Sequence, residues 1–149
     1  PLGRQAGAGR FPLPRRRRTR GSGRGGMMPR VLVVDDEPDA VELLQEFLTA
    51  KGYEVLTASR GEEALQKVRE ERPHLILLDI RMPGMNGLEV LRQVREIDQE
   101  VGVIVVTAVN EEQTGRDALA LGAFDYIVKP LDLAYLERSL WYKVTTMLL

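Results

Sequence analysis

Polar side chains that could take part in catalysis follow four separate aliphatic runs of this sequence. Asp35 and Asp36 come directly after the first run, and Asp79, Thr107 and Lys129 stand at the ends of three later ones. If these runs are strands of one parallel sheet, their carboxyl ends meet at the same edge and bring the side chains together. Three carboxylates that close repel one another and tend to hold their protons unless a cation offsets the charge.

Phosphoryl transfer is the chemistry that this set of residues can support. Carboxylate oxygens suit Mg²⁺, which usually takes one or two carboxylates together with phosphate oxygens. The cluster holds no His or Cys, and this argues against zinc. The Thr107 hydroxyl and the Lys129 ammonium could hold the oxygens of a transferred phosphoryl group. Asp79 is the natural nucleophile, because carboxylates form acyl phosphates.

Short apolar runs alternate with amphipathic stretches from Arg30 onward, and this alternation predicts the elements that position the site. The first run has the continuous aliphatic character of a strand that is covered on both faces. The predicted strands cover Val31–Val34, Tyr53–Ala58, Leu75–Leu78, Val103–Thr107 and Phe124–Val128.

Five helices are predicted between these strands and after the last one. Pro38 suits a first helical turn, and two further starts, Ser59 with Glu62 and Asn110 with Gln113, have the spacing of a capping box. The predicted helices begin near Pro38, Ser59, Asn86, Asn110 and Leu131, and the first four end near Gly52, Arg72, Gln99 and Gly122.

Five βα units in strict alternation predict an α/β protein with a doubly wound, five-stranded parallel sheet and helices on both faces. Such sheets bind ligands at the carboxyl ends of their strands, near the point where the strand order reverses. No Gly-x-Gly-x-x-Gly motif follows the first strand, so the sequence excludes a dinucleotide-binding domain.

Length and composition are those of one soluble domain. A chain of 149 residues allows a single sizeable core, and 44% hydrophobic with 29% charged residues is ordinary for a globular protein. No apolar run is long enough to cross a bilayer. The chain has no cysteine, which excludes disulfides, thiolate metal sites and a cysteine nucleophile. This composition fits a reducing compartment, and we expect a cytoplasmic location.

Charge is distributed unevenly along the chain. Residues 1–30 hold nine arginines and no acid, whereas residues 31–149 hold 12 Lys and Arg against 22 Asp and Glu. Residues 1–28 form an Arg/Gly-rich tail with a composition typical of disorder. The run Arg15–Arg18 could bind nucleic acid, but without interleaved aromatics this is the minor interpretation. The larger alternatives are translated sequence upstream of Met27 and Met28, or the remnant of an expression tag.

Four motifs together resemble the receiver domain of two-component response regulators, the CheY-like superfamily. They read VLVVDDE, LLDIRMPGMNG, VVTA and YIVKP, in this order and at these separations. The resemblance covers residues 29–149. It implies a flavodoxin-like strand order 2-1-3-4-5 and a cis peptide bond between Lys129 and Pro130.

The resemblance also implies a role for each residue of the site. Asp79 matches the phosphoacceptor, and Asp36 matches the direct Mg²⁺ ligand beside it. Asp35 matches the residue that usually holds the ion through water, and Arg81 occupies the position whose backbone carbonyl completes the metal site. The switch residues that respond to the phosphoryl group match Thr107, Lys129 and Tyr126.

A receiver domain of this kind would be a signalling switch that catalyses only its own phosphorylation and dephosphorylation. The resemblance implies that a sensor histidine kinase or a histidine phosphotransfer protein donates the phosphoryl group. Phosphorylation would change the surface formed by the fourth helix, the fifth strand and the fifth helix, and so control partner binding or dimerisation.

Three further features are particular to this sequence. Arg81 and Val109 flank the route of an attacking water and cannot orient it as a carboxylate or amide would, so we expect slow self-dephosphorylation. His74, the only histidine, is expected to be solvated. The last helix has an apolar face, but Trp141 and Tyr142 lie off it, and such exposed patches suggest a partner or a homodimer. The face residues are Leu133, Leu136, Leu140, Val144 and Met147, and Leu148 and Leu149 are also expected off the face.

Two other function classes remain open on the sequence. A phosphatase or phosphotransferase of the haloacid-dehalogenase type also uses an aspartyl phosphate after a strand. That family requires Asp-x-Asp, which neither Asp35–Glu37 nor Asp79–Arg81 provides, and the chain has no room for a cap domain. A phosphorylation-independent interaction module would typically lack the acceptor or the metal ligands, whereas the acidic set is complete here.

Overall fold

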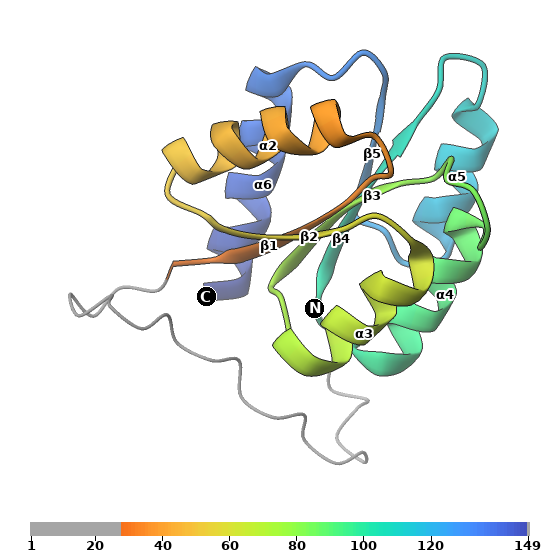
Figure 1. Ribbon diagram of the computed structural model, residues 1–149, viewed down its shortest axis with the longest axis horizontal. Coiled ribbons are helices and arrows are strands. Elements are labelled where there is room, and N and C mark those ends of the chain that lie inside the picture. The colour runs from red at the N-terminus through yellow and green to blue at the C-terminus, as the bar shows by residue number, and fades with distance from the viewer. Residues whose placement is uncertain (1–27, 149) are drawn as a thin grey trace.

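Strands and helices alternate in strict order along the chain in this computed structural model, which describes residues 28–148 (Figure 1). The predictions for residues 1–27 of the Arg/Gly-rich tail and for Leu149 therefore lie outside the described residues. The prediction for the Leu148 side chain lies outside them as well. Within residues 28–148, no helix combines the length and the apolar character needed to cross a bilayer.

The centre of the molecule is a five-stranded sheet in which neighbouring strands run parallel. Its strands are β1 (Arg30–Val34), β2 (Glu54–Ala58), β3 (Leu75–Asp79), β4 (Gly102–Thr107) and β5 (Asp125–Val128). The strand order is β2-β1-β3-β4-β5, which confirms the predicted doubly wound topology. Because the order reverses between β1 and β3, a ligand crevice is expected at the carboxyl ends of these two strands.

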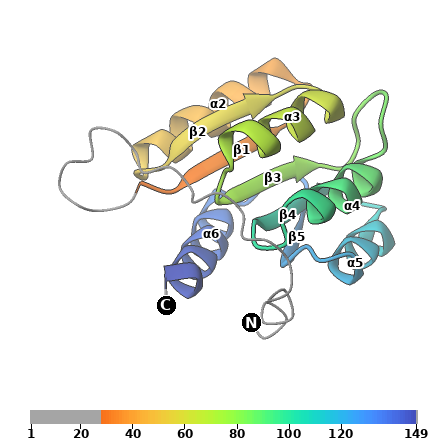
Figure 2. The ribbon, with the colours of Figure 1, turned by 90° about the horizontal axis from the view of Figure 1, so that it is seen from below.

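Five helices cover the two faces of the sheet. They are α2 (Pro38–Ala50), α3 (Gly61–Glu71), α4 (Gly87–Ile97), α5 (Glu112–Ala120) and α6 (Leu133–Leu148). Helices α3, α4 and α5 lie on one face, and α2 and α6 lie on the other (Figures 1 and 2). The core is accordingly divided into two apolar clusters, one on each face of the sheet.

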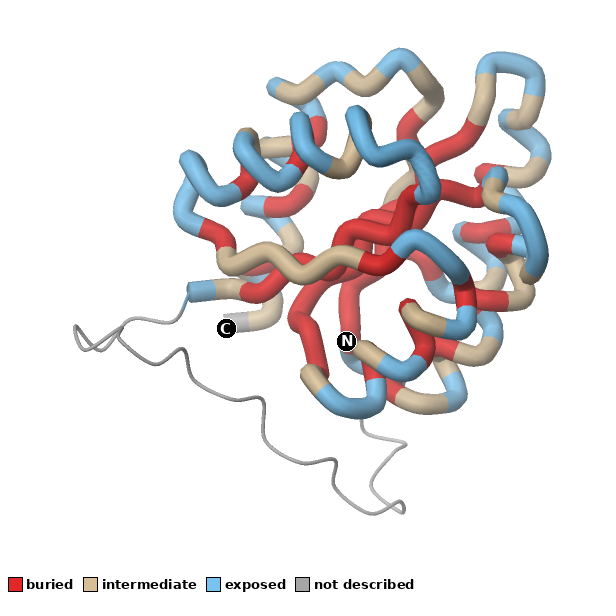
Figure 3. The backbone as a smooth tube through the Cα atoms, in the orientation of Figure 1, coloured by how far each residue is buried: buried red, intermediate tan, exposed pale blue. Residues whose placement is uncertain are grey.

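Continuous aliphatic sequence in three strands reflects burial on both faces. Every residue of β1, β3 and β4 is buried, and these are the inner strands of the sheet (Figure 3). The edge strands β2 and β5 are only partly buried. Fully burying one aliphatic side chain contributes roughly 1.5–3 kcal/mol. The inner strands therefore form a rigid base for the residues that follow them.

The turn residues after β3 start α4 close to the strand that they follow. Asn86 caps this helix, because its side-chain oxygen accepts a hydrogen bond from the Leu88 N–H at 2.7 Å. A Cβ atom at Gly87 would lie 2.6 Å from the Cα atom of Ile80, so only glycine fits at this first helical position. The Asn-Gly pair thus fixes how the loop after Asp79 returns to the helix.

The two predicted capping boxes were wrong. The α3 cap is Arg60, which makes no side-chain cap hydrogen bond, and it is Glu63 rather than Glu62 that accepts from the Ser59 N–H at 2.8 Å. The α5 cap is Glu111, one residue after the predicted cap Asn110, and it makes no side-chain cap hydrogen bond. Gln113 there bonds along the helix to Asp117 and Arg116 instead of back to the start. In both cases a one-residue error in the helix start shifts the pairing.

His74 is buried, which contradicts the prediction that it is solvated. Only 7% of its surface is exposed, and its Nδ1 atom accepts a hydrogen bond from the Arg30 N–H at 3.0 Å. Its own N–H bonds to the Arg30 carbonyl oxygen at 3.0 Å. The prediction failed because His74 extends the pairing of β3 with β1 by one residue and is therefore buried.

Helix α6 packs one face on the sheet and exposes two aromatic side chains elsewhere. Leu136, Leu140 and Val144 are buried, as predicted, with Leu133 and Met147 partly buried in the same cluster. Trp141 and Tyr142 are 61% and 66% exposed, which confirms that they lie off this face.

Candidate functional site

Three aspartates meet where the strand order reverses. Asp35 and Asp36 follow β1, and Asp79 is the last residue of the neighbouring strand β3. One carboxylate oxygen from each lies within 4.8 Å of those of the other two. Asp35 and Asp79 are buried and Asp36 is exposed, so the cluster opens to solvent on the Asp36 side.

Asp79 is held by a hydrogen bond to each of its carboxylate oxygens. Its Oδ1 atom accepts from the Arg81 N–H at 2.9 Å, and its Oδ2 atom accepts from Lys129 Nζ at 3.1 Å. Lys129 reaches this position from the end of β5, where its N–H donates to the Thr107 carbonyl oxygen at 2.8 Å. The Lys129–Pro130 peptide bond is cis, as predicted.

Burial and like charge act together on Asp35. Burial raises the pKa of its carboxyl group above the ordinary value, and the nearby charge of Asp79 raises it further. A hydrogen bond from the Glu37 N–H to Asp35 Oδ1, at 2.9 Å, opposes this shift without cancelling it. The site therefore has an electrostatic cost that a bound cation would offset.

Lys129 brings a positive charge to this cluster through its bond to Asp79. Burial alone would lower its pKa, but the hydrogen bond with Asp79 and the charges of Asp79, Asp35 and Glu37 outweigh it, so the pKa is raised. The side chain is 41% exposed, so it can move while it stays charged.

Thr107 and Tyr126 lie on the same face of the sheet as α5. Thr107 ends β4 and is fully buried, and its hydroxyl has no hydrogen-bond partner among the described residues. Tyr126 in β5 pairs with Val105, which is two residues before Thr107 on the same face. Because side chains at i and i+2 of a strand share a face, the ring and the hydroxyl are diagonal neighbours.

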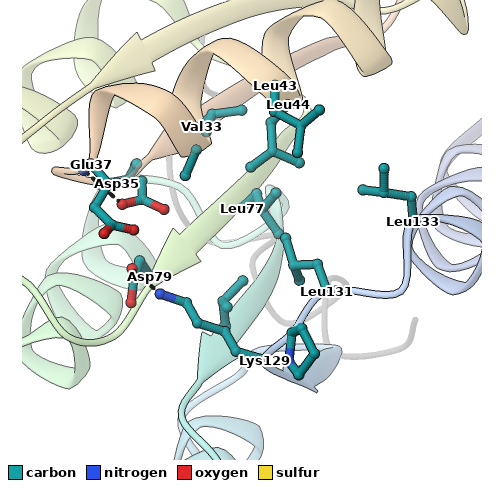
Figure 4. Close-up of a pocket in the computed structure, with 14 residues that line it drawn as sticks. Val33, Asp35, Glu37, Leu43, Leu44, Leu77, Asp79, Lys129, Leu131 and Leu133 are labelled. Carbon is teal, nitrogen blue, oxygen red and sulfur yellow. Dashed lines mark hydrogen bonds and ion pairs between the residues drawn. The ribbon is translucent and has the colours of Figure 1, made fainter.

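The residues around Asp79 are those predicted to form the site, whereas two adjoining depressions were not foreseen. The first has a volume of about 330 Å³ and lies between α2 and the segment after β5 (Figure 4). Figure 4 shows Asp35, Asp79 and Lys129 at one end of it and aliphatic side chains at the other. The aliphatic part includes Leu43, Leu44, Leu77, Leu131 and Leu133.

The second depression borders the site beyond Lys129. Its lining includes Arg81, Val109, Glu111 and Lys129. Arg81 Nε lies 3.4 Å from Glu111 Oε2. Arg81 and Val109 were predicted from the sequence to border the site, but Glu111 was not. The pattern of apolar residues in the helix does not indicate the direction of a carboxylate side chain in the loop before it.

The donor set fits Mg²⁺. The described residues bring together three carboxylates and no His or Cys at this edge, and hard oxygen ligands of this kind are those that Mg²⁺ prefers. Burial, and to a lesser extent the charge of Asp79, raises the pKa of Asp35, so a bound cation would stabilise its charged form. Asp36 and Asp79, with Asp35 behind them, are thus suited to hold the ion.

The chain belongs to the response regulator receiver family, because residues 31–140 match the family model described as the response regulator receiver domain. It is 46% identical over 104 residues to the alkaline phosphatase synthesis transcriptional regulatory protein PhoP of Bacillus subtilis. That match covers 70% of this chain and 43% of the relative. Receiver domains are signalling switches of two-component systems, and this confirms the resemblance drawn from the four motifs.

A second relative is nearly the length of this domain alone. Sporulation initiation phosphotransferase F of Bacillus subtilis is 38% identical over 107 residues, which cover 72% of this chain and 86% of that protein. By contrast, the chain spans less than half the length of the first curated relatives, such as 25% of the transcriptional regulatory protein ZraR of Klebsiella oxytoca.

Solved structures agree with the fold. The CheY-like receiver domain protein from Methanospirillum hungatei superimposes with a TM-score of 0.76 at 30% identity, covering 80% of this chain and 95% of that one. The receiver domain of NtrX from Brucella abortus gives a TM-score of 0.75 at 30% identity, covering 78% and 98%.

Proposed function

We propose that this chain is a phosphorylatable switch of a two-component phosphorelay. In this proposal Asp79 accepts the phosphoryl group. Asp36, Asp79 and the Arg81 carbonyl bind Mg²⁺, with Asp35 acting through water. The observation that carries the proposal is the meeting of three carboxylates within 4.8 Å, with the Lys129 ammonium 3.1 Å from Asp79.

The reaction is transfer of a phosphoryl group from a donor imidazole to Asp79. A carboxylate oxygen forms a bond to phosphorus while the phosphorus–nitrogen bond breaks, and the electron pair leaves with the imidazole nitrogen. When bound, Mg²⁺ offsets the charge of the phosphoryl oxygens. Lys129 exchanges its bond to the Asp79 carboxylate for one to a phosphoryl oxygen. In our proposal the chain catalyses only this reaction and its own dephosphorylation.

Thr107 and Tyr126 carry the response in this proposal. The buried Thr107 hydroxyl has no partner among the described residues, and a buried hydroxyl without a partner costs about 1–3 kcal/mol. A phosphoryl oxygen would satisfy it, so phosphorylation favours a position of Thr107 turned toward Asp79. Tyr126, its neighbour on the sheet, follows it inward and changes the surface of α5, β5 and α6.

The apolar depression beside the site suits the phosphodonor. A sensor histidine kinase or a histidine phosphotransfer protein must bring its phosphohistidine to Asp79. Leu43 is 54% exposed at the mouth of this depression, where an apolar side chain of the donor could pack while its imidazole faces the carboxylates (Figure 4). We place this encounter in the cytoplasm.

Phosphorylation of the chain with a small donor tests the proposal. We expect that incubation with Mg²⁺ and acetyl phosphate or phosphoramidate adds one phosphoryl group, visible by intact-protein mass spectrometry, acid-stable and lost in base. The matched control is Asp79→Asn, which should gain nothing, and omission of Mg²⁺ should abolish the gain in the wild type.

Two outcomes would count against the proposal. A wild-type chain that gains no mass under these conditions is not a phosphoacceptor. Steady hydrolysis of other phosphomonoesters would instead favour the haloacid-dehalogenase type of enzyme.

A further inference from the structure

Helix α5 contains a buried glycine that lies directly against the ring of Tyr126. A Cβ atom at Gly115 would be 2.5 Å from Tyr126 Cδ1, 2.6 Å from Cγ and 2.8 Å from Cε1. These three atoms form one side of the rigid ring and include Cγ, the ring atom that is bonded to Cβ. No side chain fits at Gly115 while the ring keeps this position.

The glycine has a cost that the ring contact helps to explain. Gly115 lies inside a helix of only nine residues, and glycine in a helix interior is about 1 kcal/mol less favourable than alanine. Gly115 is buried, so a backbone hydrogen faces the ring where an alanine methyl would otherwise sit. The close approach lets Tyr126 pack against the cluster that includes Val103 and Val105.

The contact between the Tyr126 ring and Gly115 occurs with one arrangement of the other switch residues, Lys129 and Thr107. Lys129 is bonded to Asp79, and the Thr107 hydroxyl has no partner among the described residues. This is the arrangement expected at rest, because a phosphoryl group would take both Lys129 and Thr107 as partners. The contact with Gly115 therefore belongs to the resting state.

We propose that Gly115 is a positioning residue of the switch: because it has no side chain, the Tyr126 ring can rest against α5. A methyl group at position 115 makes this resting position unfavourable and shifts the equilibrium toward the activated state. The inference rests on the proposed function, since it assigns a further residue to the same switch.

Titration with a phosphoryl mimic tests this role. We expect the full-length Gly115→Ala variant to bind beryllofluoride with Mg²⁺ at least about fivefold more tightly than the wild type, the lower end of ordinary coupling between sites. Titration calorimetry measures the affinity. In protein that contains 3-fluorotyrosine, the fluorine signal of Tyr126, assigned with Tyr126→Phe, should move toward its beryllofluoride-bound position before the mimic is added.

A double-variant cycle separates ring placement from a general effect on α5. In a Tyr126→Ala background there is no ring to displace, so Gly115→Ala should leave the affinity unchanged. Thr114→Ala, in the same helix, raises helix propensity but adds no atom at position 115, so it should also leave the affinity unchanged. If Gly115→Ala alone does not fold, the comparison of Gly115→Ala/Tyr126→Ala with Tyr126→Ala still tests the inference, because a difference between them overturns it.

The failure of this inference is distinguishable from that of the proposed function. If the wild type does not bind beryllofluoride, the proposed function fails. If the wild type binds it and Gly115→Ala binds equally or more weakly, the assignment of Gly115 is wrong while the phosphoacceptor stands.

Discussion

In the proposed switch, Arg81 lies where a water would approach Asp79 once this residue carries a phosphoryl group. Its guanidinium pairs with Glu111 at 3.4 Å and the side chain is 63% exposed, so the pair contributes at most about 1 kcal/mol. Val109, on the same depression, is 56% exposed. Neither side chain can accept a hydrogen bond from water, and this supports the hypothesis that self-dephosphorylation is slow.

Replacing Arg81 by an amide should shorten the lifetime of the phosphoryl group. One hydrogen bond that orients the water is worth about 1 kcal/mol, which corresponds to about fivefold in rate. We therefore expect Arg81→Asn to lose its phosphoryl group about five times faster, measured by intact mass after removal of acetyl phosphate.

Two controls define the cause of this effect. Arg81→Ala also frees Glu111 from its ion pair but supplies no amide, so an equal acceleration there would assign the effect to Glu111. Arg116→Asn, which removes an exposed arginine of α5, should decay as the wild type does. An unchanged rate in Arg81→Asn would refute the hypothesis.

Asp35 gives the site a pH dependence whose sign follows from its raised pKa. The folded protein holds the Asp35 proton more tightly than the unfolded chain, so this stabilisation is complete below the ordinary value of 3.8. It is lost as the pH rises through the raised folded pKa. At neutral pH without Mg²⁺, the charged carboxylate therefore destabilises the fold.

Asp35→Asn should for this reason be more stable than the wild type at pH 7 in EDTA. Urea unfolding measures the difference, which should shrink below pH 3.8, the ordinary value, and reverse when Mg²⁺ is added, because only the carboxylate gains from the cation. Asp39→Asn, at an exposed position of α2, is the control and should show neither effect. A less stable Asp35→Asn in EDTA would contradict the electrostatic account.

At the scale of elements, a buried ion pair joins the ends of α3 and α4. Arg72 is the C-cap of α3, with φ +49°, and its Nη2 atom lies 3.5 Å from Oδ2 of Asp98, the C-cap of α4. Asp98 is 1% exposed and also accepts from the Glu100 N–H at 2.8 Å. Removal of one partner of a buried pair leaves the other charge without compensation.

Asp98→Ala should therefore lower the free energy of unfolding by about 3 kcal/mol. Urea denaturation measures this loss, and Glu100→Ala, at an exposed neighbour, should stay within about 0.5 kcal/mol of the wild type. The pair lies at the amino ends of the strands, so folded Asp98→Ala should bind beryllofluoride normally. A loss below about 1 kcal/mol would mean that water solvates Arg72 in the variant.

Element types were predictable from the sequence, but their exact starts were not. Aliphatic runs and helical stripes located all five strands and helices because burial on a sheet imposes those periods. Caps depend on single backbone dihedrals, and for that reason Ser59 and Asn110 misled the prediction. His74 misled it too, because whether a strand end is buried depends on its neighbour, here Arg30.

At the scale of the whole molecule, the sheet topology predicts the position of the site better than any single motif does. Strict βα alternation permits few connections, since crossovers are right-handed, and Asp35, Asp79, Thr107 and Lys129 then share one edge. Two other features depend on how the helices pack on the sheet: the apolar depression beside Leu43 and the contact between Gly115 and Tyr126. Neither could be derived from sequence patterns.

The exposed aromatic side chains of α6 lead to a prediction about assembly. Trp141 and Tyr142 belong to the proposed output surface, and large exposed aromatics commonly mark interfaces. We expect the chain to form a dimer in Mg²⁺ and beryllofluoride. Trp141→Ser should raise the dissociation constant about 30-fold, because a tryptophan at the centre of an interface is worth about 2 kcal/mol or more.

Sedimentation velocity over a range of protein concentrations measures this constant. Glu137→Ala is the matched control within α6, because Glu137 pairs with Lys51 at 3.5 Å on the side toward α2, and it should dimerise as the wild type does. The monomeric Trp141→Ser variant should bind beryllofluoride as the monomeric wild type does, since the described contacts of Asp79 are with Arg81 and Lys129. A dimer of unchanged strength in Trp141→Ser would show that the interface lies elsewhere, and a chain that remains monomeric would assign the patch to a different partner.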